Sequence, residues 1–300
     1  MTPLKIALDW TFNANHLPII IASNEGFYKE HGIDFTISTP DLDNYAVTPA
    51  KKVELKQADL ALCPLESVLS YRTKSKPFPL TAIAALFKED LSAVTCKPEI
   101  ASRPSDLDGK SYASYNARYE DAIVRQMIKN DGGTGALKIV YPDKLGIWNT
   151  IENSLTDSTW IFTNWEALEA EEQKMNLNLF KMKDYDIPYS YSPVITANET
   201  EISKHPEVYR NFLSATRKGA EFGKDQPDQA VDILQSFTAE KDKLNYAKSV
   251  EITNAATSSA GDWGIMEPTN VSKFIQWLRD NHLEHSDVDP SELFTNHLLS

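Results

Sequence analysis

The chain is short of cysteine, of positive charge and of long apolar runs. Two cysteines in 300 residues, Cys63 and Cys96, are too few for a disulfide framework or a zinc site with four thiolate ligands. They favour a reducing compartment, so we expect a cytoplasmic protein. No run approaches the roughly 18 apolar residues that span a bilayer, and the N-terminus shows no basic segment followed by an apolar one, as in a secretion signal.

The charge balance excludes several classes of partner. The chain has 30 Lys and Arg residues and 43 Asp and Glu residues, which give a net charge of −13. This argues against nucleic acid, whose phosphates are neutralised by Lys and Arg, and against anionic membranes, although ordinary solubility also explains the acidity. The chain has no Gly-rich phosphate loop and no His-x-x-x-His or Cys-x-x-Cys pair, so we expect no metal. The oligomeric state is not indicated.

What is present is typical of a folded α/β protein. Hydrophobic residues make up 41% of the chain and aromatic residues 10%. Apolar strand-like segments alternate with helical patterns, which predicts a mostly parallel sheet with helices on both faces. The length of the chain, 300 residues, suits two lobes. The expected strands are Lys5–Asp9, Ile33–Ile37, Asp59–Leu62, Leu80–Leu86, Ala93–Cys96, Lys110–Ala113, Leu137–Tyr141, Thr159–Thr163, Leu177–Lys181 and Val194–Ala197. The expected helices are Leu17–Glu30, Tyr45–Gln57, Leu65–Thr73, Glu120–Asn130, Ile147–Asn153, Trp165–Lys174, Pro206–Gly223, Pro227–Ser236, Asp242–Ala256 and Asn270–Asn281.

The segment from Trp10 to Asp34 carries the clearest local signals. Pro18 suits the first turn of a helix, because its missing N–H leaves no bond unmade there. Gly26 interrupts that helix, and Gly32 can adopt the left-handed conformation that ends the next turn before the strand at Ile33. The polar and aromatic loop Trp10–His16 then follows the first strand at its carboxyl end, the edge where open α/β sheets bind ligands.

These residues also carry a family resemblance. The pattern Trp10…His16-Leu-Pro18, followed by Ala22-x-x-x-Gly-Phe-Tyr-x-x-x-Gly-Ile-Asp34, resembles the opening of the SsuA/THI5-like group. Further similar segments are Ala58–Leu62, Pro64–Ser67, Pro77–Ile83 and Asp106–Lys110. Over its whole length the chain resembles a fungal, cytosolic binding-protein-like family of about this size, which lacks a secretion signal and has a suggested thiamine-related role.

The resemblance implies a type II periplasmic-binding-protein fold. It has two α/β lobes, with residues 1–90 plus 193–300 in the first and 91–192 inserted as the second. The crossovers are expected at Lys88–Leu91 and Tyr189–Pro193, and the helical tail on the first lobe. The fold implies a small-molecule ligand in a cleft between lobes that close by hinge motion.

One branch of the group is the pyrimidine synthase of thiamine biosynthesis, and this chain departs from it. In that branch a lysine holding pyridoxal phosphate and a histidine consumed as substrate occupy the positions of Cys63 and Ser67. Its cysteine-rich iron segment is also missing. A cysteine forms no Schiff base, so we expect no cofactor and no catalytic residue. The resulting hypothesis is a binder of a pyrimidine or related thiamine-pathway metabolite; the alternative is an enzyme with Glu66 or Glu166 as general base.

Loops after four strands supply the candidate ligand-binding residues. In the first, Trp10 can stack on a planar ligand or plug the sheet edge, Asn13 and Asn15 can bind ligand or cap the helix, and His16 is favoured as a helix-start contact. In the second, Pro64, Glu66 and Ser67 begin a helix, and the Glu66 carboxylate can accept from an exocyclic amine or act as a helix-terminal charge.

The other candidates belong to the second lobe. Ser114, Tyr115 and Asn116 precede a helix and can cap it or bind ligand. Arg118 can bind an anionic group, or pair with Glu120 or Asp121 at the surface. Trp165 and Glu166 resemble the aromatic–Glu–Pro turn of these binding proteins, with Ala167 in place of proline. Tyr189 can line the cleft or stiffen the hinge, and the turn Gly261–Gly264 has no assigned role.

Overall fold

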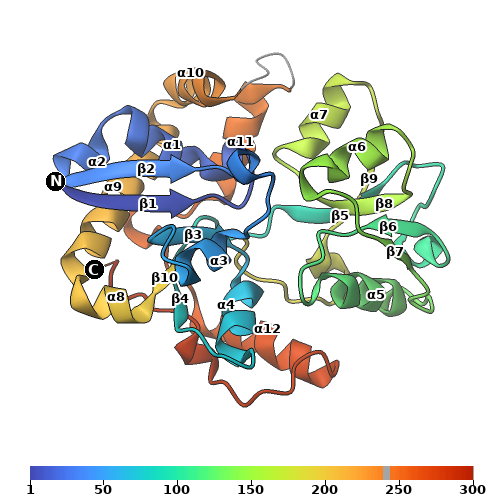
Figure 1. The fold of residues 1–300 in the computed structure, drawn as a ribbon. Coiled ribbons are helices and arrows are strands. Elements are labelled where there is room, and N and C mark those ends of the chain that lie inside the picture. Colours follow the sequence, from blue (N-terminus) through green and yellow to red (C-terminus); the bar gives the residue numbers. More distant parts are fainter. Residues whose placement is uncertain (239–243, 300) are drawn as a thin grey trace. The chain divides into compact units, whose positions relative to one another are not determined.

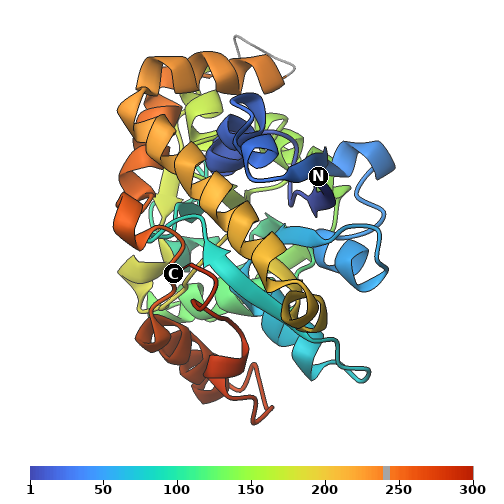
Figure 2. The same cartoon turned by 90° about the vertical axis from the view of Figure 1, so that its left-hand side faces the viewer.

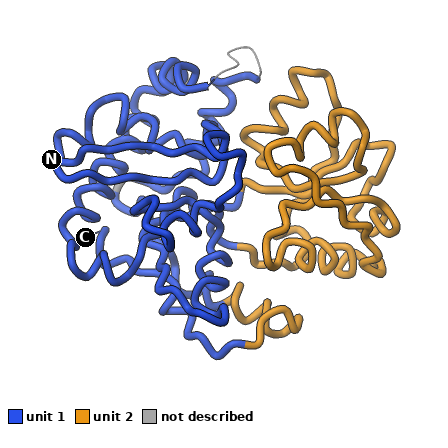
Figure 3. The backbone as a smooth tube through the Cα atoms, viewed as in Figure 1, with its two compact units in different colours: residues 1–90, 190–272, 286–300 blue, residues 91–189, 273–285 orange. Residues whose placement is uncertain are grey.

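The computed structural model describes residues 1–238 and 244–299. The chain divides into two compact units (Figures 1 and 3). Unit 1 comprises Met1–Asp90, Ser190–Ser272 and Ser286–Ser300, and unit 2 comprises Leu91–Tyr189 and Lys273–His285. The segment Lys273–His285 thus groups with unit 2, whereas the sequence assigns it to the first lobe. Each unit is built on a five-stranded sheet.

The sheet of unit 1 has the order β2-β1-β3-β10-β4. Strands β1 (Thr2–Ala7), β2 (Ile33–Ser38) and β3 (Leu60–Cys63) are parallel. Strand β10 (Val194–Asn198) runs antiparallel between β3 and β4 (Leu80–Ala85). All residues of β3 and β4 are buried, which explains their continuous apolar sequences.

Helices cover both faces of this sheet. The connections β1–α1–β2 and β2–α3–β3 run in opposite directions across it, so right-handed crossovers place α1 (Leu17–Asn24) and α3 (Pro49–Glu54) on opposite faces. The long helix α9 (Pro206–Asp225) packs against α1 and is visible along its length in Figure 2. The other helices that begin in unit 1 are α2 (Phe27–Glu30), α4 (Leu65–Thr73), α8 (Glu199–Lys204), α10 (Pro227–Phe237), α11 (Tyr246–Ala256) and α12 (Pro268–Asp280).

Three glycines determine how α1 is built into unit 1. Gly26, at φ 78°, separates α1 from α2, and Gly32, at φ 76°, ends α2, as the sequence predicts. At the α1–α9 contact, a Cβ on Gly219 would lie 2.1 Å from the carbonyl oxygen of Pro18. Only glycine therefore permits this close approach of the two helices.

The sheet of unit 2 has the order β7-β6-β8-β5-β9. Strands β6 (Ser111–Ala113), β7 (Lys138–Val140) and β8 (Ser158–Phe162) are parallel, and β5 (Ser92–Cys96) is antiparallel to β8 and to β9 (Asn178–Phe180). Its helices are α5 (Glu120–Asn130), α6 (Ile147–Glu152), α7 (Glu166–Glu172) and the end of α12.

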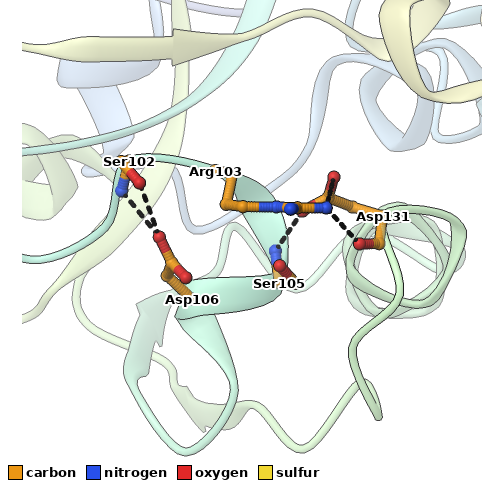
Figure 4. A network of polar contacts seen from close by, with 5 residues as sticks. All are labelled: Ser102, Arg103, Ser105, Asp106 and Asp131. Carbon is orange, nitrogen blue, oxygen red and sulfur yellow. Dashed lines mark hydrogen bonds and ion pairs between the residues drawn. The ribbon is translucent and has the colours of Figure 1, made fainter.

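A polar network ties the segment before β6 to the end of α5 in unit 2 (Figure 4). The Arg103 guanidinium donates to both carboxylate oxygens of Asp131, at 2.8 and 2.6 Å, and the N–H of Ser105 donates to the same carboxylate. These bonds lower the pKa of Asp131 to about 2. Asp106 accepts from the N–H and hydroxyl of Ser102, which lowers its pKa as well.

Each expected strand is found in the described residues, with ends that move by up to three positions. The observed helices differ from the expected ones more than the strands do. The expected helix Tyr45–Gln57 begins at Pro49, because residues 39–48 form a loop, and α8 is a helix that the sequence analysis missed. Residues 242 and 243 of the expected helix Asp242–Ala256 lie outside the described residues. No helix of the described chain is long and apolar enough to cross a membrane.

Candidate functional site

The carboxyl edge of the sheet in unit 1 gathers the loops that follow β1, β2 and β3. Because these strands are parallel, their carboxyl ends meet at one edge, where ligands of open α/β sheets bind. The antiparallel β10 begins at this edge, and the carbonyl of Tyr191, just before it, accepts the first N–H of α4 from Leu65 at 3.1 Å. The edge therefore carries Asp9 and Trp10, the loop to Tyr45, and the turn Cys63–Ser67.

The loop after β1 is organised by its own polar side chains. The N–H of Asn13 donates to Nδ1 of His16 at 3.3 Å, so the proton of this imidazole is on Nε2, which donates to Asp9 Oδ1 at 2.8 Å. The Asn13 amide accepts from the N–H of Asn15 at 2.8 Å and donates to the Thr11 carbonyl at 3.1 Å. Asn13 and His16 thus act as the helix cap and helix-start contact that the sequence offers as alternatives to ligand binding. Asn13 and Asn15 are both buried.

Trp10 contacts an aromatic residue that the sequence analysis did not select. The rings of Trp10 and Tyr45 lie with centroids 6.1 Å apart and planes tilted by 55°. Burial raises the pKa of the Tyr45 phenol, and the nearby charge of Asp9 raises it further. Trp10, Tyr45 and Asp9 therefore form an aromatic corner with an adjacent carboxylate.

Tyr45 reaches this corner through a strained loop. Asn44 and Tyr45 have φ values of 51° and 56°, two consecutive left-handed residues, of which the tyrosine is the costly one. The N–H of Tyr45 donates to the carbonyl of Pro40 at 2.7 Å. The ammonium of Lys52, a buried residue of α3, lies 2.9 Å from Asp43 Oδ2. The signal that could have found this loop is Pro49, which marks the first turn of α3.

The turn after β3 brings the Glu66 carboxylate close enough to Cys63 for its charge to act on the thiol. Burial raises the pKa of the Cys63 thiol to about 12, with the charges of Asp9 and Glu66 adding to the shift and hydrogen bonds to Thr196 and Ser67 opposing it. Glu66, in the first turn of α4, is 5% exposed. Pro64 caps that helix, and its carbonyl accepts the N–H of Ser67 at 2.9 Å. The thiol is therefore protonated at neutral pH and is a poor nucleophile.

In unit 2 the loop after β6 is shaped by a buried carboxylate. Glu120 accepts from the N–H of Tyr115 at 3.0 Å, from the N–H of Ala117 at 3.2 Å and from the hydroxyl of Tyr112 at 2.8 Å. Burial raises the pKa of Glu120, and these three bonds oppose the shift. The buried Ser114 hydroxyl accepts the N–H of Asn116 at 2.9 Å, so Ser114 caps this loop and Asn116, at φ 59°, is exposed.

Arg118 pairs with a residue that lies far away in the sequence. Its Nη2 is 3.0 Å from Oε2 of Glu284, just after α12, which is neither of the two nearby carboxylates, Glu120 and Asp121, that the sequence suggests as partners. The Glu284 carboxylate is 3% exposed and also accepts from the hydroxyl of Tyr119 and from the N–H of His285. The arginine proposed as an anion contact thus already faces a buried carboxylate.

The remaining candidates of unit 2 make contacts within their own unit, and Trp165 and Glu166 are buried. Trp165 and Glu166 begin α7, and one oxygen of Glu166 accepts the N–H of Phe162 at 3.0 Å. Tyr189 packs edge-on between Trp160 and Phe274, with ring centroids 5.2 and 5.3 Å away. This packing favours the stiffening role for Tyr189. Among residues 1–238 and 244–299, no group of three or more His, Cys, Asp or Glu side chains is arranged to hold a metal ion.

Two mixed α/β units, each with loops gathered at the carboxyl ends of its parallel strands, define a periplasmic-binding-protein fold. A Candida albicans protein whose structure exhibits the generic periplasmic-binding-protein fold superposes with a TM-score of 0.72 and 13% identity, covering 99% of this chain and 97% of that one. Residues 13–230 match the family described as NMT1/THI5 like, and the chain belongs to that family. The fold and family expected from the sequence are therefore confirmed.

Two relatives of the chain carry names that concern substituted pyrimidines. The formylaminopyrimidine-binding protein of Halalkalibacterium halodurans is 23% identical over 290 residues, which cover 92% of this chain and 84% of the relative. The 4-amino-5-hydroxymethyl-2-methylpyrimidine phosphate synthase of Legionella pneumophila is 23% identical over 235 residues, covering 77% and 72%. The chain thus resembles both a binding protein and a synthase.

Proposed function

We propose that this protein binds an amino-substituted pyrimidine of the thiamine pathway and does not carry out the synthase reaction. The observation that supports this most directly is the aromatic corner of Trp10 and Tyr45 beside Asp9, at the same sheet edge as Glu66. Aromatic rings stack on a planar heterocycle, and carboxylate oxygens accept hydrogen bonds from an exocyclic amine. Strain in the Asn44–Tyr45 backbone is typical of residues held in place for a function.

The turn after β3 favours binding over synthesis. The positions that resemble the lysine and histidine of the synthase branch are Cys63 and Ser67, and a protonated, buried thiol supplies neither an amine nor a base. The general-base alternative with Glu66 or Glu166 stays a prediction. For Glu166 it has to compete with the bond that its carboxylate accepts from Phe162.

Calorimetric titration with 4-amino-5-hydroxymethyl-2-methylpyrimidine and with formylaminopyrimidine tests the proposal. We expect saturable one-site binding to the wild-type protein, weakened about tenfold in Trp10→Leu and in Tyr45→Leu, as expected when a stacking contact worth about 1.4 kcal/mol is lost. The matched control is Tyr71→Leu, which removes a ring from a similar aromatic pair with Phe78, centroids 6.2 Å apart, near the end of α4. It should bind like the wild type.

Two outcomes would count against this function. If the folded protein, checked by cooperative thermal unfolding, gives no heat of binding with either pyrimidine, substituted pyrimidines are ruled out as its ligands. Conversion of the bound pyrimidine, detected by mass spectrometry of the titrated samples, would establish the enzyme alternative instead.

We also propose a cytoplasmic location. The support is that Cys63 and Cys96 are free and buried, one in each unit, as is common in a reducing compartment. Fractionation of the source cells with antibody detection tests this, and recovery from an extracytoplasmic fraction would overturn it.

A further inference from the structure

The carboxylate of Asp9, just after β1 in unit 1, is oriented by a buried histidine. His16 is 0% exposed, and its Nε2 donates to Asp9 Oδ1 at 2.8 Å. The other ring nitrogen, Nδ1, accepts the N–H of Asn13 at 3.3 Å, so the proton of the neutral ring stays on Nε2. The imidazole therefore determines which oxygen of Asp9 is used inside the protein.

The loop after β1 holds Asn13 in place as well. Its side-chain oxygen accepts the N–H of Asn15 at 2.8 Å, and its side-chain nitrogen donates to the carbonyl of Thr11 at 3.1 Å. Asn13 is 3% exposed, and a buried polar group that is already hydrogen-bonded moves only at a cost. The chain of hydrogen bonds from Asn13 through His16 to Asp9, which we call the His16 relay, is thus built within one loop of unit 1.

The His16 relay directs the second oxygen of Asp9, Oδ2, away from the histidine. The Asp9 side chain is 18% exposed, and its charge acts on the phenol of Tyr45, whose ring contacts Trp10. A carboxylate oxygen accepts hydrogen bonds and donates none. An N–H group of a ligand at this place is therefore favoured, whereas a carbonyl oxygen at the same place is repelled.

From this geometry we infer that Asp9 selects a 4-aminopyrimidine over the corresponding 4-oxopyrimidine, and that Asn13 and His16 are positioning residues that present Oδ2 of Asp9 to the ligand. The inference deepens the proposed function and rests on it. It assigns the reading of the amino group to a residue that the sequence analysis did not select, and it uses residues of unit 1 alone.

The test compares dissociation constants for 4-amino-5-hydroxymethyl-2-methylpyrimidine and for 5-hydroxymethyl-2-methylpyrimidin-4-one, which carries a carbonyl in place of the amine. We expect the wild-type protein to prefer the amine at least about tenfold. In Asp9→Asn, His16 still donates to the side-chain oxygen, so an NH₂ group replaces Oδ2. Binding of the amine should weaken about thirtyfold and that of the oxo compound should strengthen about tenfold, which reverses the preference.

Asp34→Asn is the matched control for this substitution. Asp34 is exposed near the amino end of β2, at the edge of the unit 1 sheet opposite to Asp9. The variant makes the same change of charge and shape, and it should keep the wild-type ratio of the two dissociation constants.

Two variants of His16 separate a positioning role from a purely structural one. His16→Gln and His16→Leu both remove the acceptor Nδ1, but only the glutamine has an N–H donor at the same distance along the side chain as Nε2. We expect His16→Gln to retain most of the wild-type preference for the amine, and His16→Leu to reduce it to within about threefold of unity. This pair also serves as the test if Asp9→Asn does not unfold cooperatively.

The opposing results are distinct. Equal wild-type affinity for the two compounds, a wild-type ratio in folded Asp9→Asn, or the same ratio in His16→Gln and His16→Leu would overturn the inference while the proposed function stands. Failure of the wild-type protein to bind either compound would instead remove the proposed function.

Discussion

The ammonium of Lys52 lies 2.9 Å from a carboxylate oxygen of Asp43, and this ion pair joins α3 to the loop that presents Tyr45. The Lys52 side chain is 9% exposed and the Asp43 side chain 31%. Asp43 ends the short 3₁₀ turn before the two left-handed residues Asn44 and Tyr45. The Lys52–Asp43 ion pair therefore fixes the start of a strained segment that ends at Tyr45, whose ring contacts Trp10.

Replacement of Lys52 by methionine should affect stability and ligand binding together. Asp43 would lose its cation, and because it is only partly buried we expect a loss of about 1–2 kcal/mol in the free energy of unfolding. Pyrimidine binding should weaken several-fold, since the Tyr45 ring would no longer be fixed. Urea denaturation and calorimetric titration measure the two effects.

The adjacent Lys51 provides the control for this experiment. It lies on the exposed side of α3 and pairs with Glu54 at 2.7 Å, so Lys51→Met should change the free energy of unfolding by no more than about 0.5 kcal/mol. Normal pyrimidine affinity in a destabilised Lys52→Met protein would show that the loop does not position Tyr45 for binding.

The sequence predicts the strands well because their signal is local. Leu60–Cys63 and Leu80–Ala85 are buried on both sides, and a strand of that kind needs an unbroken apolar run wherever it lies in the fold. Gly26 and Gly32 are local signals as well, since a left-handed residue ends a helix in any context.

The candidate site is predicted less completely, because its decisive contacts join distant residues. The partner of Arg118 is Glu284, at a separation that no spacing rule covers, whereas the sequence offers an anionic ligand or the nearby Glu120 and Asp121. The sequence predicts a helix from Tyr45 onward, whereas the helix begins at Pro49.

Acid should destabilise unit 2 through Asp131. The Arg103 guanidinium and the N–H of Ser105 lower the pKa of this carboxyl from 3.8 to about 2 (Figure 4). Between these two values the unfolded chain binds more protons than the folded one, so stability falls as the pH falls. The contribution of Asp131 to the free energy of unfolding is complete above about pH 4 and is lost as the pH drops through about 2.

Thermal unfolding measured from pH 2 to pH 6 checks this expectation. Asp131→Asn should lower the melting temperature at pH 6 and flatten its decline toward pH 2, because the folded-state proton affinity no longer differs from the unfolded one at this residue. Asp184→Asn removes an exposed carboxylate of the same unit and should retain the wild-type slope. A wild-type slope in Asp131→Asn would assign the acid sensitivity to other carboxyls.

The two thiols should resist alkylation for as long as the protein is folded. Cys63 is 5% exposed with a pKa of about 12, and Cys96 is fully buried with a pKa of about 11. The thiolate is the form that reacts, so burial and low ionisation together predict that iodoacetamide at pH 8 labels neither cysteine of the folded protein within hours. In 8 M urea, where the chain is unfolded and neither thiol is buried, both should react within minutes. Ser75→Cys, at an exposed position, should be labelled rapidly in the native protein and confirms that the reagent is active. Rapid native labelling of Cys63, mapped by peptide mass spectrometry, would show an accessible thiolate at the edge of the unit 1 sheet, and the case for binding without covalent chemistry would then lose its main support.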